Sequence, residues 1–121
     1  MLVTGSRDWE DREAVFRAIA AVRQEVGERP ITVVHGDCPT GADAMAAYLC
    51  LRQGPGFNLT EEAHPANWQL EGKQAGPIRN ARMVNLGADI CLAFIRNGSR
   101  GASQTARLAE QAGIPVRRWT A

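Results

Sequence analysis

The stretch LVTGSRDWEDREAVFRAIAAVRQEVGERPITVV, residues 2–34, decides the fold class. Its first residues, Leu2-Val3-Thr4, predict a short strand, and its last, Ile31-Thr32-Val33-Val34, predict a strand buried on both faces because most of them are β-branched. Between the two strands we expect a helix over 11–26, since apolar residues recur there at helical spacing: Ala14, Val15, Ala18, Ile19, Val22 and Val26. A strand, an amphipathic helix and a buried strand in this order indicate a β-α-β unit with parallel strands.

The rest of the chain continues the alternation of strands and helices. We expect helices over 42–52, 77–86 and 103–112, and strands over 59–63, 90–94 and 116–119. Gly54-Pro55-Gly56 predicts a turn or a loose loop, and the first and last of these three strands are expected at sheet edges. The resulting order, β-α-β-α-β-α-β-α-β, predicts an α/β three-layer sandwich. It has a five-stranded parallel sheet with helices on both faces and strand order 3-2-1-4-5.

The composition is typical of one globular domain spanning 1–121. A net charge of +1, from 14 basic and 13 acidic residues, argues against a broad nucleic-acid surface. The longest apolar run, 44–51, is far shorter than the ~20 residues that span a membrane, and the first residues lack a secretory signal pattern. Cys38, Cys50 and Cys91 form no CxxC pair, so we expect reduced thiols, no metal site, no membrane partner and a cytoplasmic location.

Three glycine-containing loops follow predicted strands at the carboxyl end of the sheet. They are Gly5-Ser6-Arg7-Asp8-Trp9 after the first strand, the loop from His35 to Asp43 after the second, and the loop from Asn97 to Ser103 after the fourth. In the predicted topology the strand order reverses between the first and fourth strands, where ligands of open α/β sheets bind. These features together favour phosphate binding. Helix N-termini offer free N–H groups, glycine lets an anion approach the backbone, and Ser and Arg side chains add hydrogen-bond donors. The alternative is that these glycines only make tight turns.

No Walker A sequence and no dinucleotide fingerprint occurs, which argues against an ordinary ATPase or dehydrogenase. Trp68, and likewise Trp9, can stack on a base or a sugar at the mouth of the crevice, or can pack against a neighbouring helix. Arg79 and Asn80 lie near the start of a predicted helix and are expected to point into the crevice. A partly buried arginine needs an anion, either a ligand or a salt bridge to Asp43 or Asp89.

These motifs, in this order and spacing, resemble the YspA/YpsA-related branch of the SLOG superfamily nearly from end to end. The resemblance is carried by two of the glycine-containing loops, Gly5-Ser6-Arg7-Asp8-Trp9 and His35-Gly36 with Gly41-Ala42-Asp43. Three further segments add to it: Pro65-Ala66-Asn67-Trp68, Gly76 with Arg79-Asn80 and Met83, and Ala88-Asp89 before Phe94. It implies a Rossmann-like fold and the binding of nucleotides or nucleotide-derived ligands. Many members of that branch are uncharacterised bacterial or phage proteins.

A related family is the Lonely Guy family of nucleoside-monophosphate phosphoribohydrolases, which cleave the bond between base and ribose phosphate. Its signature is a proline-glycine-glycine loop that continues to Gly-Thr and a catalytic Glu, together with an Arg a few residues before a Met. Arg79 and Met83 are similar to the latter pair, and Gly98 and Gly101 resemble the loop. The resemblance therefore implies phosphate binding more strongly than hydrolysis.

The resemblance implies hydrolysis less strongly, because two signature residues of the Lonely Guy family are missing. Ala102 stands where that family has the threonine, and Thr105 stands where it has the catalytic glutamate. A threonine cannot carry the charge that stabilises an oxocarbenium-like centre. Catalysis would instead need a carboxylate from Asp37, Asp43 or Asp8.

A second relative, the DNA-processing protein A family, shares a Gly-Ser-Arg loop and binds single-stranded DNA. A local basic groove could come from five residues: Arg7, Arg79, Arg82, Arg96 and Arg100. The near-neutral net charge argues against this alternative of an oligonucleotide-binding or interaction module.

We therefore expect a protein that senses or sequesters a small nucleotide-like ligand, without a cofactor, with phosphoribohydrolase activity as the alternative. The expected ligand-binding residues are Gly5, Ser6, Arg7, Trp9, His35, Gly36, Arg79, Asn80, Gly98, Ser99, Arg100, Gly101 and Ser103. The expected catalytic residues, if the ligand is cleaved, are Asp37 and Asp43. An exposed Trp119 and a short C-terminal edge strand suggest a homodimer or higher homo-oligomer.

Overall fold

The computed structural model describes residues 1–121 and contains one five-stranded sheet in which every strand pair is parallel. The strand order is β3-β2-β1-β4-β5, so the predicted topology is confirmed. The strands are β1 (Leu2–Gly5), β2 (Ile31–His35), β3 (Leu59–Ala63), β4 (Cys91–Ile95) and β5 (Val116–Thr120). The helices are α1 (Arg12–Val26), α2 (Gly41–Phe57), α3 (Trp68–Glu71), α4 (Ala75–Asn85) and α5 (Arg100–Gln111), with a 3-10 turn η1 (Gly72–Gln74).

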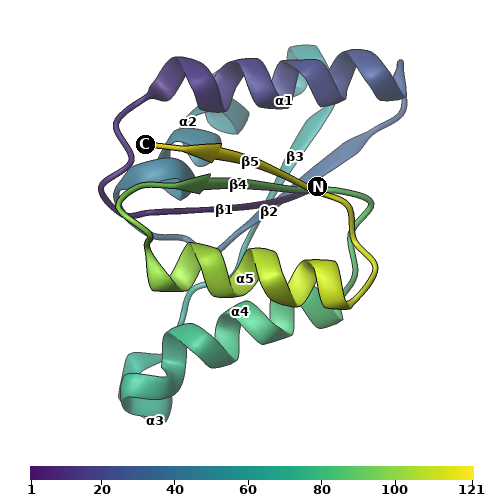
Figure 1. The fold of residues 1–121 in the computed structure, drawn as a ribbon. Coiled ribbons are helices and arrows are strands. Elements are labelled where there is room, and N and C mark those ends of the chain that lie inside the picture. The colour runs from purple at the N-terminus through teal and green to yellow at the C-terminus, as the bar shows by residue number, and fades with distance from the viewer.

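The helices form two layers around the sheet, α1 and α2 on one face and α4 and α5 on the other (Figure 1). The larger core cluster lies under α1 and α2 and includes Val15, Ile19, Val33, Leu92 and Phe94. Two smaller clusters lie under α4 and α5. The apolar stripe expected over 11–26 is thus the buried face of α1.

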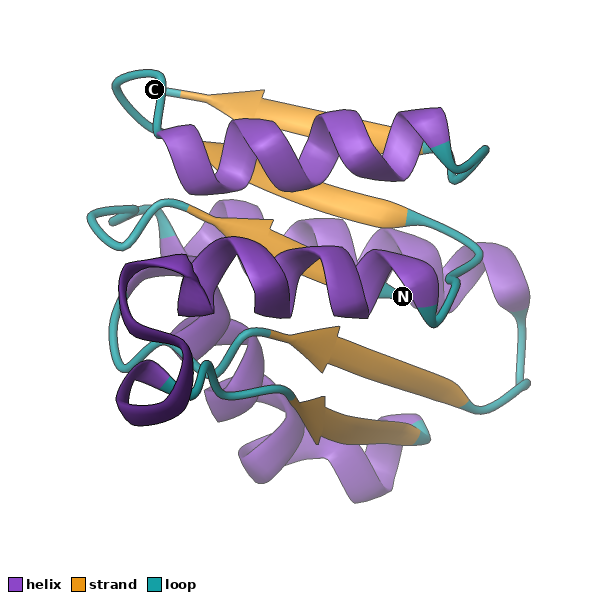
Figure 2. Cartoon of the chain, turned by 90° about the horizontal axis from the view of Figure 1, so that it is seen from below, coloured by secondary structure: helices purple, strands orange, loops and turns teal.

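The second layer covers only part of its face of the sheet. Figure 2 shows α4 and α5 in front of β1, β4 and β5, while β2 and β3 have no helix in front of them. A hollow of about 960 Å³ lies along this side and includes Thr32, Val34 and Glu62 from the bare strands, Met83 from α4 and Leu86 directly after it. No residue of the three glycine loops, at 5–9, 35–43 and 97–103, lines it.

One expected boundary was wrong in the middle of the chain. Gly54-Pro55-Gly56 is not a turn but the last part of α2, which runs to Phe57 and ends at Asn58 in the left-handed conformation. Buried Gly54 packs against the backbone of Leu59. Packing against β3 therefore favours a helical last turn, although Pro55 in that turn lacks the N–H that would bond to the preceding turn.

Three further expectations needed correction. The segment after β3 forms α3 and η1, and α4 begins at Ala75, so Pro77 lies inside the first turn, where a missing N–H costs nothing. The helix expected from Ser103 begins at Arg100. Trp119 is not exposed but half-buried, because its ring stacks on Phe94 with centroids 4.8 Å apart. No helix is long and apolar enough to cross a bilayer.

The end of β1 and the first turn of α2 approach each other so closely that both must carry glycine. A Cβ on Gly5 would overlap the Ala42 side chain, and a Cβ on Gly41, whose φ is +74°, would overlap the Ser6 carbonyl oxygen. Ser6 continues the sheet, since its N–H donates to the Phe94 carbonyl at 2.8 Å. This contact therefore fixes α2 relative to the central strands.

We expect Gly41→Ala to lower the free energy of unfolding by about 1–3 kcal/mol, because the new methyl group adds overlap to an unfavourable φ. The matched control is Gly56→Ala in the same helix, where a Cβ meets open space and should raise stability by roughly 0.5–1 kcal/mol. Urea unfolding followed by circular dichroism measures both. Equal effects of the two substitutions would contradict the close approach.

Candidate functional site

A cleft of about 560 Å³ lies at the carboxyl ends of the strands, at the point where the strand order reverses. Gly5 and Phe94 pair at the ends of β1 and β4, so the loops that leave these strands lie side by side. The cleft is bordered by those two loops, by the loop between β2 and α2, and by the first turns of α4 and α5. This is the location that the topology predicts for a ligand.

Arg79 from α4 is the central charged group of the cleft, although only 7% of its surface is exposed. Its Nε donates to Asn80 Oδ1 at 2.7 Å, and its Nη1 donates to the carbonyl oxygens of Gly36 and, at 3.3 Å, His64. No carboxylate lies within ion-pair distance, so the predicted alternative of a salt bridge to Asp43 or Asp89 is not found.

The second terminal nitrogen of Arg79, Nη2, has no partner in the protein and is not among the fully enclosed polar atoms. Since Arg79 lines the cleft, we infer that its free edge faces that space. Gly36 makes this placement possible, because a Cβ there would lie 2.7 Å from Arg79 Cζ. A buried guanidinium held by carbonyl and amide oxygens keeps its full positive charge for an anion.

Asp43, in the first turn of α2, lies in the wall of the cleft and is also buried. Its Oδ2 accepts the N–H groups of Gly36, at 3.1 Å, and Cys38, at 3.4 Å, whereas its Oδ1 is buried and has no partner. Burial raises the pKa of the Asp43 carboxyl, and His35, the Cys38 amide and Arg79 oppose that rise. The carboxylate therefore fixes the β2–α2 loop while one oxygen is left over.

Two helix N-termini at the cleft are open. α2 and α5 have no hydrogen bond from a side chain at their N-caps. By contrast, α1 begins at the same end of the sheet and is capped by Asp11, whose side chain accepts the N–H of Ala14. α4 continues from η1, and the N–H of Ala75 donates to the Gly72 carbonyl. The first turns of α2 and α5 therefore carry unpaired N–H groups and the positive ends of helix dipoles, which favour an anion.

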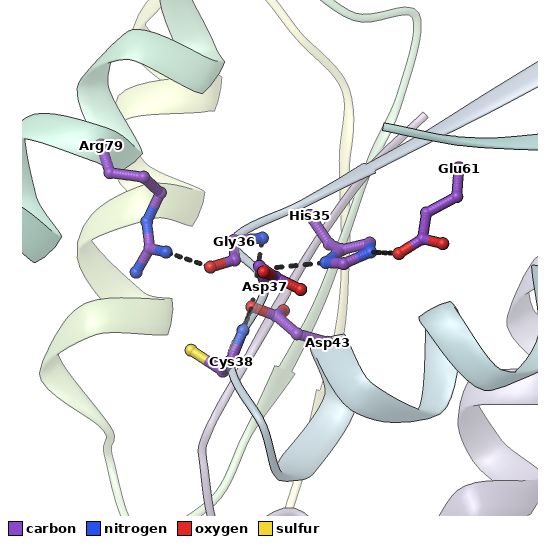
Figure 3. A network of polar contacts seen from close by, with 7 residues as sticks. All are labelled: His35, Gly36, Asp37, Cys38, Asp43, Glu61 and Arg79. Atoms are coloured by element: carbon purple, nitrogen blue, oxygen red, sulfur yellow. Dashed lines mark hydrogen bonds and ion pairs between the residues drawn. The ribbon is translucent and has the colours of Figure 1, made fainter. Parts of the chain in front are cut away.

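His35, Asp37 and Glu61 form a hydrogen-bonded chain beside the cleft (Figure 3). His35 Nδ1 accepts the N–H of Asp37 at 2.9 Å, and His35 Nε2 lies 2.8 Å from Glu61 Oε1. Their ligand atoms lie within 4.8 Å of one another, a spacing that could hold a metal ion. However, Nδ1 already contacts the N–H of Asp37 and Nε2 already contacts the Glu61 carboxyl, so both ring nitrogens are used within the protein. This chain holds Asp37 at a φ of +57° and shapes the loop.

Most of the predicted ligand-binding residues are brought together. Nine predicted residues line the cleft: Gly5, Arg7, Gly36, Asp43, Arg79, Asn80, Ser99, Arg100 and Gly101. Trp68 lines it as well and is half exposed, with the Arg7 guanidinium 5.9 Å from its ring centroid. Trp68 thus supplies the planar surface that was expected from either Trp9 or Trp68.

The remaining predicted residues do not line the cleft: Ser6, Trp9, His35, Asp37, Gly98 and Ser103. Ser6 is buried, and its Oγ accepts the N–H of Arg96 at 2.7 Å, which ties the ends of β1 and β4 together. Trp9 is a core residue beside Phe94, and its indole N–H donates to the Asp11 carbonyl at 2.9 Å. The Ser6 and Trp9 side chains therefore lie in the protein interior and support the residues that line the cleft.

Sequence reasoning missed several residues that line the cleft: Thr4, Cys38, Gly76, Pro77, Ala102 and Gln104. Cys38 was considered only as a thiol, although it lies inside one of the glycine loops. The sequence signal that could have placed Gly76 and Pro77 at the cleft was their position at the start of a predicted helix. A Cβ on Gly76 would lie 3.3 Å from the Trp68 ring, so this glycine leaves space for the tryptophan.

The three thiols should differ in reactivity. Burial raises the pKa of Cys50 to about 11 and that of Cys91 to about 12. Cys38 is only half-buried, although burial raises its pKa too. We expect iodoacetamide to label Cys38 alone in the native protein, faster as the pH rises from 8 to 9.5, and all three after unfolding. Peptide mass spectrometry measures this, and native labelling of Cys91 would contradict it.

Comparison with known proteins agrees with the fold and the motifs. Residues 1–70 match the YspA, cpYpsA-related SLOG family. The chain is 42% identical over 118 residues to the Gene 61 protein of Mycobacterium phage D29, covering 96% of this chain and 92% of that protein. No solved structure matches. The chain therefore belongs to the YspA, cpYpsA-related SLOG family.

Proposed function

We propose that this protein binds a nucleotide or a nucleotide-derived phosphorylated ligand in the cleft, as a sensor or a sequestering protein. The observation that carries the proposal is Arg79, a buried guanidinium with no carboxylate partner and one free edge at the cleft. An arginine in this setting costs free energy unless an anion completes its bonding. Membership of a SLOG family supports a nucleotide-related ligand.

The phosphate end of the ligand is assigned to the side of the cleft formed by α4 and α5. The first turn of α5 offers Ser99, Arg100 and Gly101, and Gly101 has no heavy atom near its missing Cβ, so an anion can approach the backbone. Arg79 lies on α4, which packs beside α5. Two arginines and an uncapped helix N-terminus are a suitable set of groups for one phosphate.

The planar end of the ligand is assigned to Trp68. Its ring is half exposed at the cleft and lies between Gly76, which packs on its edge, and the guanidinium of Arg7, 5.9 Å from the ring centroid. A base that enters between Trp68 and Arg7 would gain stacking on both, since guanidinium groups also stack on planar rings. The cleft volume of about 560 Å³ lies within the range of roughly 300–1,000 Å³ found for small-molecule sites.

We expect Arg79→Gln to weaken the binding of nucleoside monophosphates by about tenfold to a hundredfold, because a charge-assisted hydrogen bond is lost. The matched control is Arg82→Gln, one turn further along α4, where the side chain is exposed and lies outside the cleft. Isothermal titration calorimetry measures both. Because Arg79 is buried, Arg100→Gln at the exposed rim provides a second test in a variant that should fold normally. Equal binding by all four proteins would contradict the proposal.

A second candidate function, cleavage of a nucleoside-monophosphate N-glycosidic bond, is favoured by one observation. Asp43 is a buried carboxylate in the wall of the cleft, and burial raises its pKa, as suits a group that exchanges protons. Asp37 lies outside the cleft, and the hydroxyl of buried Thr105 donates to the Gly101 carbonyl at 2.9 Å. Of the three candidate carboxylates, Asp43 and the exposed Asp8 line the cleft, and Asp43 is the buried one.

Under this second candidate, the protein should release free base from a nucleoside monophosphate, and Asp43→Asn should abolish the release while Asp37→Asn leaves it unchanged. Chromatography of the reaction mixture measures base and ribose 5-phosphate. Recovery of the nucleotide intact after prolonged incubation would exclude hydrolysis and leave a sensor or sequestering protein.

A further inference from the structure

The outer face of α2 is apolar, although the helix already buries its opposite face against the sheet. Ala46 and Cys50 are buried in the core, whereas Tyr48 and Leu51 on the other side are 47% and 76% exposed. Residues 44–51 are the longest apolar run of the chain, which gives the helix apolar side chains on both faces. A helix that is apolar all round is normally covered on every side. The outer face of α2 therefore has the character of a surface that a partner covers.

The exposed side chains of this face follow the spacing by which one helix packs along another. They are Ala44, Tyr48, Leu51 and Pro55, at positions i, i+4, i+7 and i+11 of α2. Alternating steps of four and three residues keep side chains on one face of a helix and form the seam between paired helices. These four residues, the outer stripe, extend over about 17 Å of α2. The outer stripe is thus suited to a second helix.

Two arginines border the outer stripe. Arg12 Cζ lies 5.6 Å and Arg52 Cζ 5.8 Å from the centroid of the Tyr48 ring. Both arginines are exposed, and neither forms an ion pair. The sequence has no acidic residue between Asp43 and Glu61. α2 therefore does not neutralise these two charges, and a partner that carries carboxylates complements them.

A second copy of this chain is a poor partner for the outer stripe. A twofold axis brings the same surface of both copies together, so the guanidinium groups of Arg12 and Arg52 would face their own counterparts. A nucleic-acid strand is also a poor partner. Its bases stack on open aromatic faces, whereas the Tyr48 ring already lies against two guanidinium groups.

We propose that the outer stripe of α2 binds an acidic amphipathic helix of another protein. The apolar side chains of that helix pack on Tyr48 and Leu51, and its carboxylates pair with the two bordering arginines. This surface is separate from the cleft, because neither Tyr48 nor Leu51 nor the two arginines line it. Asp43 in the first turn of the same helix does line the cleft, so α2 connects the two surfaces.

The test uses two synthetic three-heptad peptides that share leucines along one seam. Glutamates flank the seam in the acidic peptide, and lysines replace them in the basic peptide. We expect the full chain to bind the acidic peptide about tenfold more tightly than the basic one, and the difference to shrink as the salt concentration rises. Fluorescence anisotropy of the labelled peptides measures both affinities.

Leu51→Glu should weaken binding of the acidic peptide about tenfold, because it places a carboxylate in the apolar seam. The matched control is Leu70→Glu on α3, where the leucine is 80% exposed and lies away from the outer stripe, and it should leave binding unchanged. The double variant Arg12→Glu with Arg52→Glu should reverse the preference, so that the basic peptide binds more tightly.

Equal affinity for the two peptides, or binding of neither, would overturn this inference. It would also be overturned if the double variant lost binding to phosphatidylglycerol vesicles or to a single-stranded oligonucleotide and kept its preference between the peptides. Nucleotide binding should be the same in all these variants, since the altered side chains lie outside the cleft. Failure of this inference therefore leaves the proposed function intact.

Discussion

The close approach of the β1 end to the first turn of α2 is the constraint on which the site depends. Gly5 and Gly41 make it possible, because each would overlap the opposite backbone or side chain if it carried a Cβ. The contact places α2 so that Asp43 reaches the N–H groups of Gly36 and Cys38. Those bonds orient the Gly36 carbonyl toward Arg79. A close contact between two glycine positions thus contributes to where the Arg79 guanidinium lies.

The electrostatic arrangement follows from this geometry. Arg79 and Asp43 are both buried and lie near each other, yet they bond to opposite ends of one residue instead of forming an ion pair. A direct pair would have neutralised both groups and left nothing for a ligand. With Gly36 between them, each group keeps one unsatisfied edge. The cost of burying the two charges is offset in part by their bonds to the backbone, and the anion proposed to bind beside Arg79 would offset more of it.

The fold could be predicted from the sequence because it depends on local patterns. The apolar stripe of α1 and the β-branched run of β2 carry enough periodicity to specify a strand-helix alternation, and handedness rules reduce the possible topologies to few. The end of α2 could not be predicted, since Gly54-Pro55-Gly56 disfavours a helix locally and becomes helical only through packing against Leu59. There tertiary contact outweighs local propensity.

The site was predictable as a location but not as a set of side-chain directions. Glycine loops after β1, β2 and β4 marked the cleft, yet Ser6 and His35 in those loops point inward, because Arg96 and Glu61 offer hydrogen bonds that arise only after folding. The two sides of the cleft also differ in how firmly their residues are held. The phosphate side is built on long helices, whereas Trp68 lies on α3, which has no buried residue. In the proposed complex a rigid anion site would therefore supply most of the affinity, and the less constrained α3 would adjust to the base.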